Sequence, residues 1–177
     1  MSGMKLTTTA LLLLASASFA DAPSRVEASL ARGEDAILSI HDAKGTKLLR
    51  ALEAAKPHFA RARRLAAKGL EGAPGDEALA NAYANATGRL VAILNAETVL
   101  YLERDARPLA RKRNGEALRL LPKDERALAL KDAIASPDPY VPDVGVVDLV
   151  GGVTGKPQAR TGVSQRYLDR RRASFAR

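Results

Sequence analysis

Residues 76–100 read DEALANAYANATGRLVAILNAETVL, and the spacing of their side chains decides the fold. One face repeats every three or four residues, which is the period of an α-helix. Asp76 precedes this pattern and can accept hydrogen bonds from the free amides of a first helical turn. The stretch therefore predicts a long helix that begins near Asp76 and whose repeating positions are Leu79, Tyr83, Ala86, Leu90, Ile93, Glu97 and Leu100.

The preceding stretch has the same period and predicts a second long helix. Pro57 lies within it, and because proline lacks the amide hydrogen that an inner helical position donates, we expect a kink or a restart there. Residues 72–75 (Gly-Ala-Pro-Gly) predict the turn that joins the two helices. The repeating positions of this helix are Leu48, Leu52, Ala55, Phe59, Ala62, Ala66 and Gly69.

Three further helices are expected around this pair. The first carries Val26, Leu30, Ile37 and Ile40 and ends before Gly45. A fourth is expected over residues 108–121, and a fifth begins at position 123 or 124 and ends at 135. The connections are short, so neighbouring helices should form antiparallel hairpins. Residues 21–135 also hold 27 Ala against 3 in residues 136–177, and alanine is the best helix former. The fold class is therefore all-α, with the helical domain at residues 21–135.

Composition excludes several classes of protein. The chain has 177 residues, of which 46% are hydrophobic and 4% aromatic, so it is neither acidic disorder nor an aromatic-rich binding module. It contains no Cys, which removes disulfides, thiol nucleophiles, Cys-ligated zinc and iron–sulfur clusters. Two His cannot build a three-histidine metal site. We expect no cofactor and no metal.

Residues 1–20 have the pattern of a signal peptide. A short start with one cation, Lys5, precedes an apolar or small stretch at 6–17, and Ser18-Phe19-Ala20 provides small residues before a cut ahead of Asp21. A membrane anchor or a buried first helix is the alternative, but a span needs about 20 apolar residues. The sequence thus predicts a soluble exported protein, periplasmic or secreted, with no transmembrane segment after signal removal.

Two helix ends resemble tetratricopeptide repeats, at residues 69–79 and 117–128. In that family a unit of about 34 residues forms a helical hairpin that ends with a proline. With Pro122 as that proline, Tyr101 falls on the aromatic position of the first helix, and Ala110 and Ala117 fall on close-packing positions. Leu94 stands in for the usual tryptophan. Placed on Pro74, the same pattern recovers three further positions, Leu49, Ala62 and Gly69.

The sequence also departs from the tetratricopeptide pattern. Glu97 and Thr98 replace the expected Leu-Gly, Asn114 replaces an aromatic residue, and the two prolines are 48 positions apart. The resemblance covers at most two degenerate repeats, at residues 43–135. The resemblance implies a surface that binds a peptide or another protein.

The C-terminal part has a different composition. Residues 136–162 begin with three prolines in six positions and predict an extended linker or arm, in which residues 144–150 form a short strand or extended segment. Residues 163–177 predict a short basic helix or tail.

No motif of known catalytic chemistry is complete. The Gly-Val-Thr-Gly-Lys run ending at Lys156 lacks the first glycine of a phosphate-binding loop and has Pro157 where a hydroxyl should follow. His41 and His58 are expected on solvated or half-buried helix faces. The acidic pairs Glu34-Asp35, Asp76-Glu77 and Asp124-Glu125 are expected in or near first helical turns, where the helix dipole favours them. We assign no catalytic residues, although an enzyme with an unfamiliar site stays an alternative.

The positive charge is concentrated in the tail. The chain has a net charge of +8, and removal of residues 1–20 leaves +7. Residues 155–177 carry +6 of this, so the rest of the mature chain is nearly neutral. Basic clusters at residues 56–68 and 104–113 are interpreted as solvated helix faces with salt bridges. Arginine pairs well with phosphates and carboxylates, so the candidate contacts with an anionic partner are Lys156, Arg160, Arg166, Arg170, Arg171 and Arg172.

These observations favour an exported, non-enzymatic protein-interaction scaffold or adaptor with a basic docking tail. The expected partner is a protein. The alternative is a binder of anionic polymers or lipid surfaces of the cell envelope that acts through the tail. A nucleic-acid partner is not expected.

Overall fold

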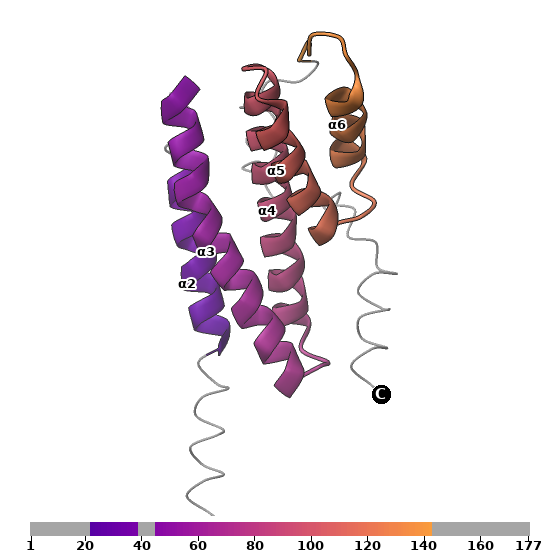
Figure 1. Ribbon diagram of the computed structural model, residues 1–177. Coiled ribbons are helices and arrows are strands. Elements are labelled where there is room, and N and C mark those ends of the chain that lie inside the picture. The colour runs from indigo at the N-terminus through magenta and orange to yellow at the C-terminus, as the bar shows by residue number, and fades with distance from the viewer. Residues whose placement is uncertain (1–21, 39–44, 143–177) are drawn as a thin grey trace, which may run out of the picture.

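The computed structural model describes residues 22–38 and 45–142. These ranges contain no strand, which confirms the all-α class (Figure 1). The helices in these ranges are α2 (Ala22–Leu38), α3 (Gly45–Gly72), α4 (Glu77–Leu102), α5 (Arg107–Leu120) and α6 (Glu125–Ala135).

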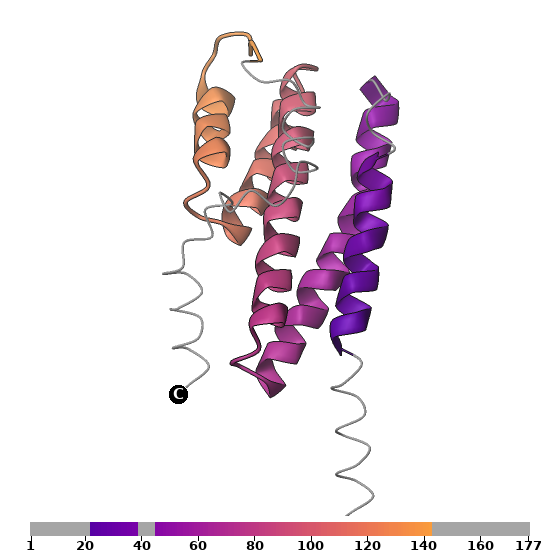
Figure 2. The ribbon, with the colours of Figure 1, turned by 180° about the vertical axis from the view of Figure 1, so that it is seen from behind.

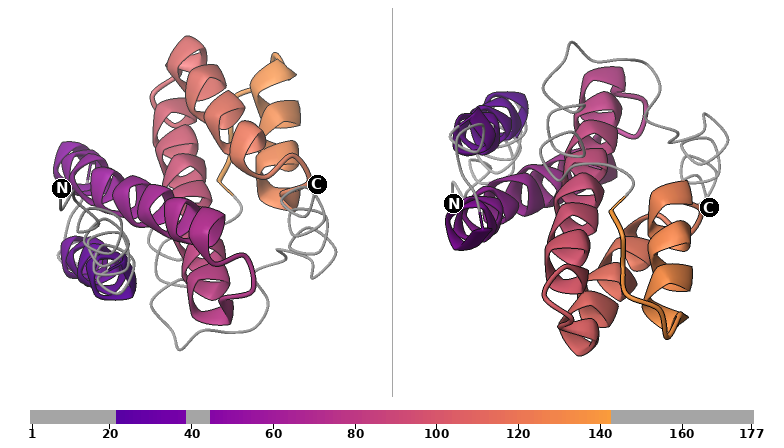
Figure 3. Two further views of the ribbon diagram at one scale, coloured as in Figure 1. Left: turned by 90° about the horizontal axis from the view of Figure 1, so that it is seen from below. Right: turned by 90° about the horizontal axis from the view of Figure 1, so that it is seen from above.

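Each helix runs antiparallel to the one before it, as the short connections predicted (Figures 1 and 2). α4 lies in the middle, with α3 on one side and α5 and α6 on the other (Figure 3). α2 packs mainly along α3 and also contacts α4. The central position of α4 is reflected in its burial, because every residue from 93 to 100 is buried. A helix that is buried on every side at one level needs neighbours all around it.

Aspartates begin two of the helices, as the sequence predicted. Oδ1 of Asp76 accepts a hydrogen bond from the backbone N–H of Leu79, at 3.0 Å, and caps α4. Oδ1 of Asp124 accepts one from the backbone N–H of Ala127, at 2.8 Å, and caps α6. Both side chains satisfy amides that have no partner within the helix.

Of the kink or restart expected at Pro57, the restart does not occur, because α3 continues from Gly45 to Gly72 with Pro57 inside it. The proline lies on the exposed side of the helix, as does Glu53 one turn earlier. The carbonyl of Glu53, which loses its helical partner at Pro57, therefore lies on the side that water can reach. This placement reduces the penalty that proline imposes in a buried helix interior.

The core combines many alanines with a few large side chains. Small side chains at helix contacts allow helices to approach closely. Phe59 and Leu52 of α3 and Ile93 of α4 are fully buried in one cluster. The alanines with no exposed surface are Ala55, Ala62, Ala66, Ala86, Ala96, Ala110, Ala117 and Ala127.

Residues 136–142 follow α6 without helical structure, so the helix does not continue into the proline-rich stretch. Their first part is held by Arg107 of α5, whose guanidinium donates to the carbonyls of Ile134, Ser136 and Asp138. The predicted signal peptide, the strand or extended segment at residues 144–150 and the basic tail lie outside the described residues. Among the described helices, none is long and apolar enough to cross a membrane.

Candidate functional site

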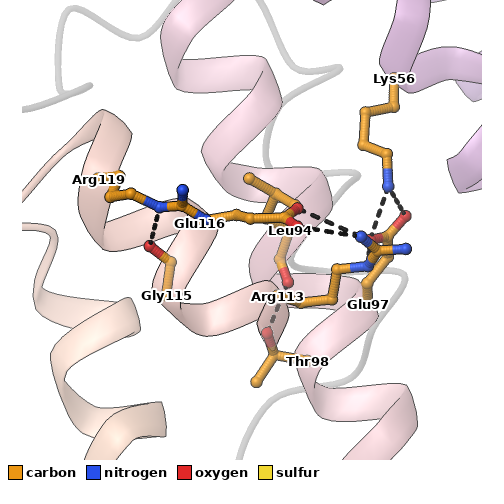
Figure 4. A network of polar contacts seen from close by, with 8 residues as sticks. All are labelled: Lys56, Leu94, Glu97, Thr98, Arg113, Gly115, Glu116 and Arg119. Atoms are coloured by element: carbon orange, nitrogen blue, oxygen red, sulfur yellow. Dashed lines mark hydrogen bonds and ion pairs between the residues drawn. The ribbon is translucent and has the colours of Figure 1, made fainter. Parts of the chain in front are cut away.

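A buried carboxylate, Glu97, lies at the centre of the helix stack. Its side chain has no exposed surface. Nζ of Lys56, from α3, donates to both carboxylate oxygens at 2.8 and 3.0 Å. Nε of Arg113, from α5, forms an ion pair with Oε2 at 2.8 Å. Figure 4 shows the two cations reaching Glu97 from opposite neighbours of α4. We call Lys56, Glu97 and Arg113 the buried ion cluster.

A second acid supports the cluster from α5. Nη1 of Arg113 contacts Oε2 of Glu116 at 3.2 Å, one turn along the same helix (Figure 4). Burial favours the neutral form of Arg113, but Glu97 and Glu116 outweigh this and raise the pKa of its guanidinium. Arg113 therefore stays charged, and Glu116 fixes the direction from which it meets Glu97.

Burial raises the pKa of Glu97 above its ordinary value of 4.5. The hydrogen bonds from Lys56 and the positive charges of Lys56 and Arg113 act in the opposite direction and offset part of this effect. The two cations thus offset part of the desolvation penalty for the ionised carboxyl group, which is the penalty expected for an acid removed from water. The fully buried carboxylate of Glu97 therefore joins three helices, α3, α4 and α5.

This pKa direction predicts how stability depends on pH. A raised pKa means that the folded protein binds more protons than the unfolded chain between pH 4.5 and the folded-state value. The stabilisation from the protonated carboxyl is present below pH 4.5 and is lost as pH rises through the folded-state pKa. We expect the free energy of unfolding of the native protein, minus that of Glu97→Gln, to increase as pH falls from 7 to 4. Denaturant titrations of both proteins at several pH values measure this difference. A difference that increases toward neutral pH would contradict the prediction.

A second ion pair joins α2 to α4. Nε of Arg89 lies 2.8 Å from Oε1 of Glu34, and burial raises the pKa of this carboxyl while Arg89 partly offsets the effect. The prediction that Glu34 and Asp35 lie near a first helical turn is wrong, since they lie near the C-terminal end of α2. Glu34 is held there by its cross-helix partner and not by the helix dipole. The other two acidic pairs begin α4 and α6, as expected.

Neutral polar side chains join α4 and α5 to α6. Nδ2 of Asn95 donates to Oδ1 of Asp124 at 2.9 Å, so this aspartate caps α6 and also ties it to α4. Nδ2 of Asn114, in α5, donates to the carbonyl of Ala127 at 2.7 Å. Asn114 stands where the tetratricopeptide pattern has an aromatic residue, and here the hydrogen bond connects the two helices.

The basic clusters were expected to be solvated faces with salt bridges, but four of their side chains are only partly exposed and contact neighbouring elements. Lys56 and Arg113 belong to the buried ion cluster. Arg63 lies over the ring of Tyr83, 5.1 Å from its centroid, and Nη2 donates to the tyrosine hydroxyl at 2.9 Å. Arg107 binds the end of α6. Helix geometry turns these side chains toward their neighbours, whereas the exposed members of the same clusters are Arg61, Arg64, Lys68, Arg104, Arg111 and Lys112.

Sequence reasoning did not assign the buried ion cluster as a site. Its only signal was that Glu97 occupies a position of the apolar repeat in α4. The candidate tail contacts, Lys156, Arg160, Arg166 and Arg170–Arg172, lie outside the described residues, as does His41. His58 is half-buried, as predicted. The described residues include no group of three His, Cys, Asp or Glu side chains that could hold a metal ion.

The fold and the site together define a class: an all-α protein of stacked antiparallel hairpins, joined by buried ionic and amide contacts. No protein-family model, curated protein or solved structure matches the chain.

Proposed function

We propose that this chain is an exported, non-enzymatic scaffold that presents the outer faces of its helices to a protein partner. The observation that supports this most directly is the complete burial of the carboxylate in the buried ion cluster. Its carboxylate has no exposed surface and is occupied by cations from two other helices. Buried ionic groups contribute little net stability, but they can specify one packing arrangement. A specified arrangement is useful where a surface must be held in one shape.

The hairpin geometry supports the same proposal. Ala110 and Ala117, the positions matched to close-packing alanines of tetratricopeptide repeats, have no exposed surface. Leu94, matched to the tryptophan, is also buried. Export is supported by the signal-peptide pattern of residues 1–20. The second candidate function, binding of an anionic polymer or lipid surface, is supported by the +6 charge of residues 155–177.

Site-specific photo-crosslinking in the expressing cell tests the scaffold proposal. A photoreactive residue replaces one exposed side chain on each outer helix in turn, namely Ala28 of α2, Ala60 of α3, Leu109 of α5 or Ala129 of α6. We expect at least one position to give a discrete protein adduct, because a docked partner lies within reach of the probe. Buried Ala96 of α4 is the matched control and should give no adduct with another protein.

A second form of the chain that ends at residue 154 separates the two candidate functions. A protein adduct that persists in this form supports the scaffold. If no position gives an adduct, the scaffold proposal fails. If each adduct disappears when the tail is removed, the scaffold proposal also fails, and the tail carries the interaction.

A further inference from the structure

The outer face of α3 carries five exposed cations that have no partner within the described chain. These are Lys47, Arg50, Arg61, Arg64 and Lys68. No ion pair or hydrogen bond joins their side chains to the described residues, whereas the cations on the inner sides of α3, Lys56 and Arg63, are both engaged. In the left view of Figure 3, α3 crosses in front of α4, and all five of these side chains are exposed. We call these five residues the α3 basic stripe.

The charges in the second half of the stripe are not balanced along the helix. Side chains three or four positions apart are neighbours on a helix surface. Arg61 and Arg64 have no acidic residue at these distances, and Arg64 neighbours both Arg61 and Lys68. Like charges at this spacing destabilise a helix, so an anion bound along the stripe would relieve repulsion as well as form ion pairs.

The width of the stripe indicates the shape of its partner. Glu53 and Glu71 are also exposed on α3, at the edge of the stripe. A broad anionic plane such as a membrane would meet these acids. The exposed residues of α3 include no large apolar side chain that could enter a bilayer. The face fits a narrow, linear partner.

The spacing of the stripe fits a row of carboxylates. At the rise of an α-helix, Arg61 and Lys68 are about 10 Å apart along the axis, and the whole stripe is about 30 Å long. Acidic residues seven positions apart on a partner helix have the same spacing as Arg61 and Lys68, and acidic residues three positions apart match the separation of about 5 Å between Arg61 and Arg64. Apart from Glu53 at the edge of the stripe, the exposed residues between the cations are small, namely Ala54, Pro57 and Ala60, so a second helix can approach. Arginine also pairs with carboxylates through two parallel hydrogen bonds.

We infer that the α3 basic stripe is the docking surface for an acidic protein segment. This inference rests on the proposed scaffold function and names the partner by its chemistry. Charge complementarity across such a surface accelerates encounter and selects the partner.

The test measures binding of a labelled 20-residue helical peptide, with Glu every three or four positions on one face, to the full chain by fluorescence anisotropy. The variant is R61Q/R64Q/K68Q. The matched control is R111Q/K112Q/K131Q, which removes three exposed cations from α5 and α6. We expect the stripe variant to bind about tenfold more weakly and the control to change by less than about twofold. Circular dichroism checks that both variants remain helical.

Further results separate the alternatives. A Gln version of the peptide should not bind, and added salt should weaken binding of the Glu peptide. Equal losses in the stripe and control variants would overturn the inference, because binding would then depend only on total charge. If the stripe variant loses binding to anionic phosphatidylglycerol vesicles but still binds the peptide, the surface is assigned to lipid and the inference fails. If photo-crosslinking finds a partner at α6 but not at α3, the scaffold proposal stands and this inference fails.

Discussion

Replacement of Glu97 with alanine is expected to lower the free energy of unfolding by about 2–5 kcal/mol, which is the usual cost of truncating a large, fully buried side chain to alanine. The change leaves a cavity in the middle of α4 and removes the carboxylate that accepts hydrogen bonds from Lys56 and forms an ion pair with Arg113. Denaturant titration at pH 7 measures the effect.

Two further variants separate charge from packing. Glu97→Gln keeps the size of the side chain and an acceptor for Lys56, and because burial disfavours the ionised acid, its effect should stay within about 1 kcal/mol. The triple variant K56M/E97L/R113M should be as stable as the native protein or more so, since an apolar cluster avoids the desolvation of charge. If the triple variant is as unstable as Glu97→Ala, the ionic contacts contribute net stability and this account is wrong.

Replacement of Phe59 with alanine is expected to have an effect of similar size, about 3–5 kcal/mol. The ring is fully buried and ends against Gly33 of α2, where a Cβ atom would lie 2.6 Å from Cζ. The contact works because one helix has no side chain at the point where the other inserts its largest one. Thermal or denaturant unfolding of the variant measures the loss.

The complementarity of these two residues predicts strong non-additivity. Gly33→Ala alone should cost about 1–3 kcal/mol, because the ring must move in a packed core. In the Phe59→Ala protein the same change should be nearly neutral or stabilising, since alanine favours a helix over glycine by about 1 kcal/mol. Gly115→Ala in α5 is the matched control, because no atom lies within 4 Å of its added Cβ, and it should stabilise. Additive effects of Gly33→Ala and Phe59→Ala would show that the two residues do not oppose each other.

The helices were predictable because their signals are local. The period of the apolar positions in α3 and α4, the aspartate caps at positions 76 and 124, and the Gly-Pro turn at 72–75 all act within a few residues. The restart at Pro57 failed for a reason that is not local. Whether a proline ends a helix depends on whether the carbonyl one turn earlier can reach water, and that depends on which side of the helix faces the bundle.

The amino-acid sequence by itself determined the all-α class, the positions of the helices and the separation of the neutral body from the basic C-terminal residues. Only the tertiary structure decided which charges are paired. Lys56 and Glu97 are 41 positions apart, and no periodicity relates one to the other. They meet because α3 and α4 cross at that level. A helical sequence fixes the face on which a side chain lies, but its partner is fixed by the crossing of two helices, which depends on contacts along their whole length.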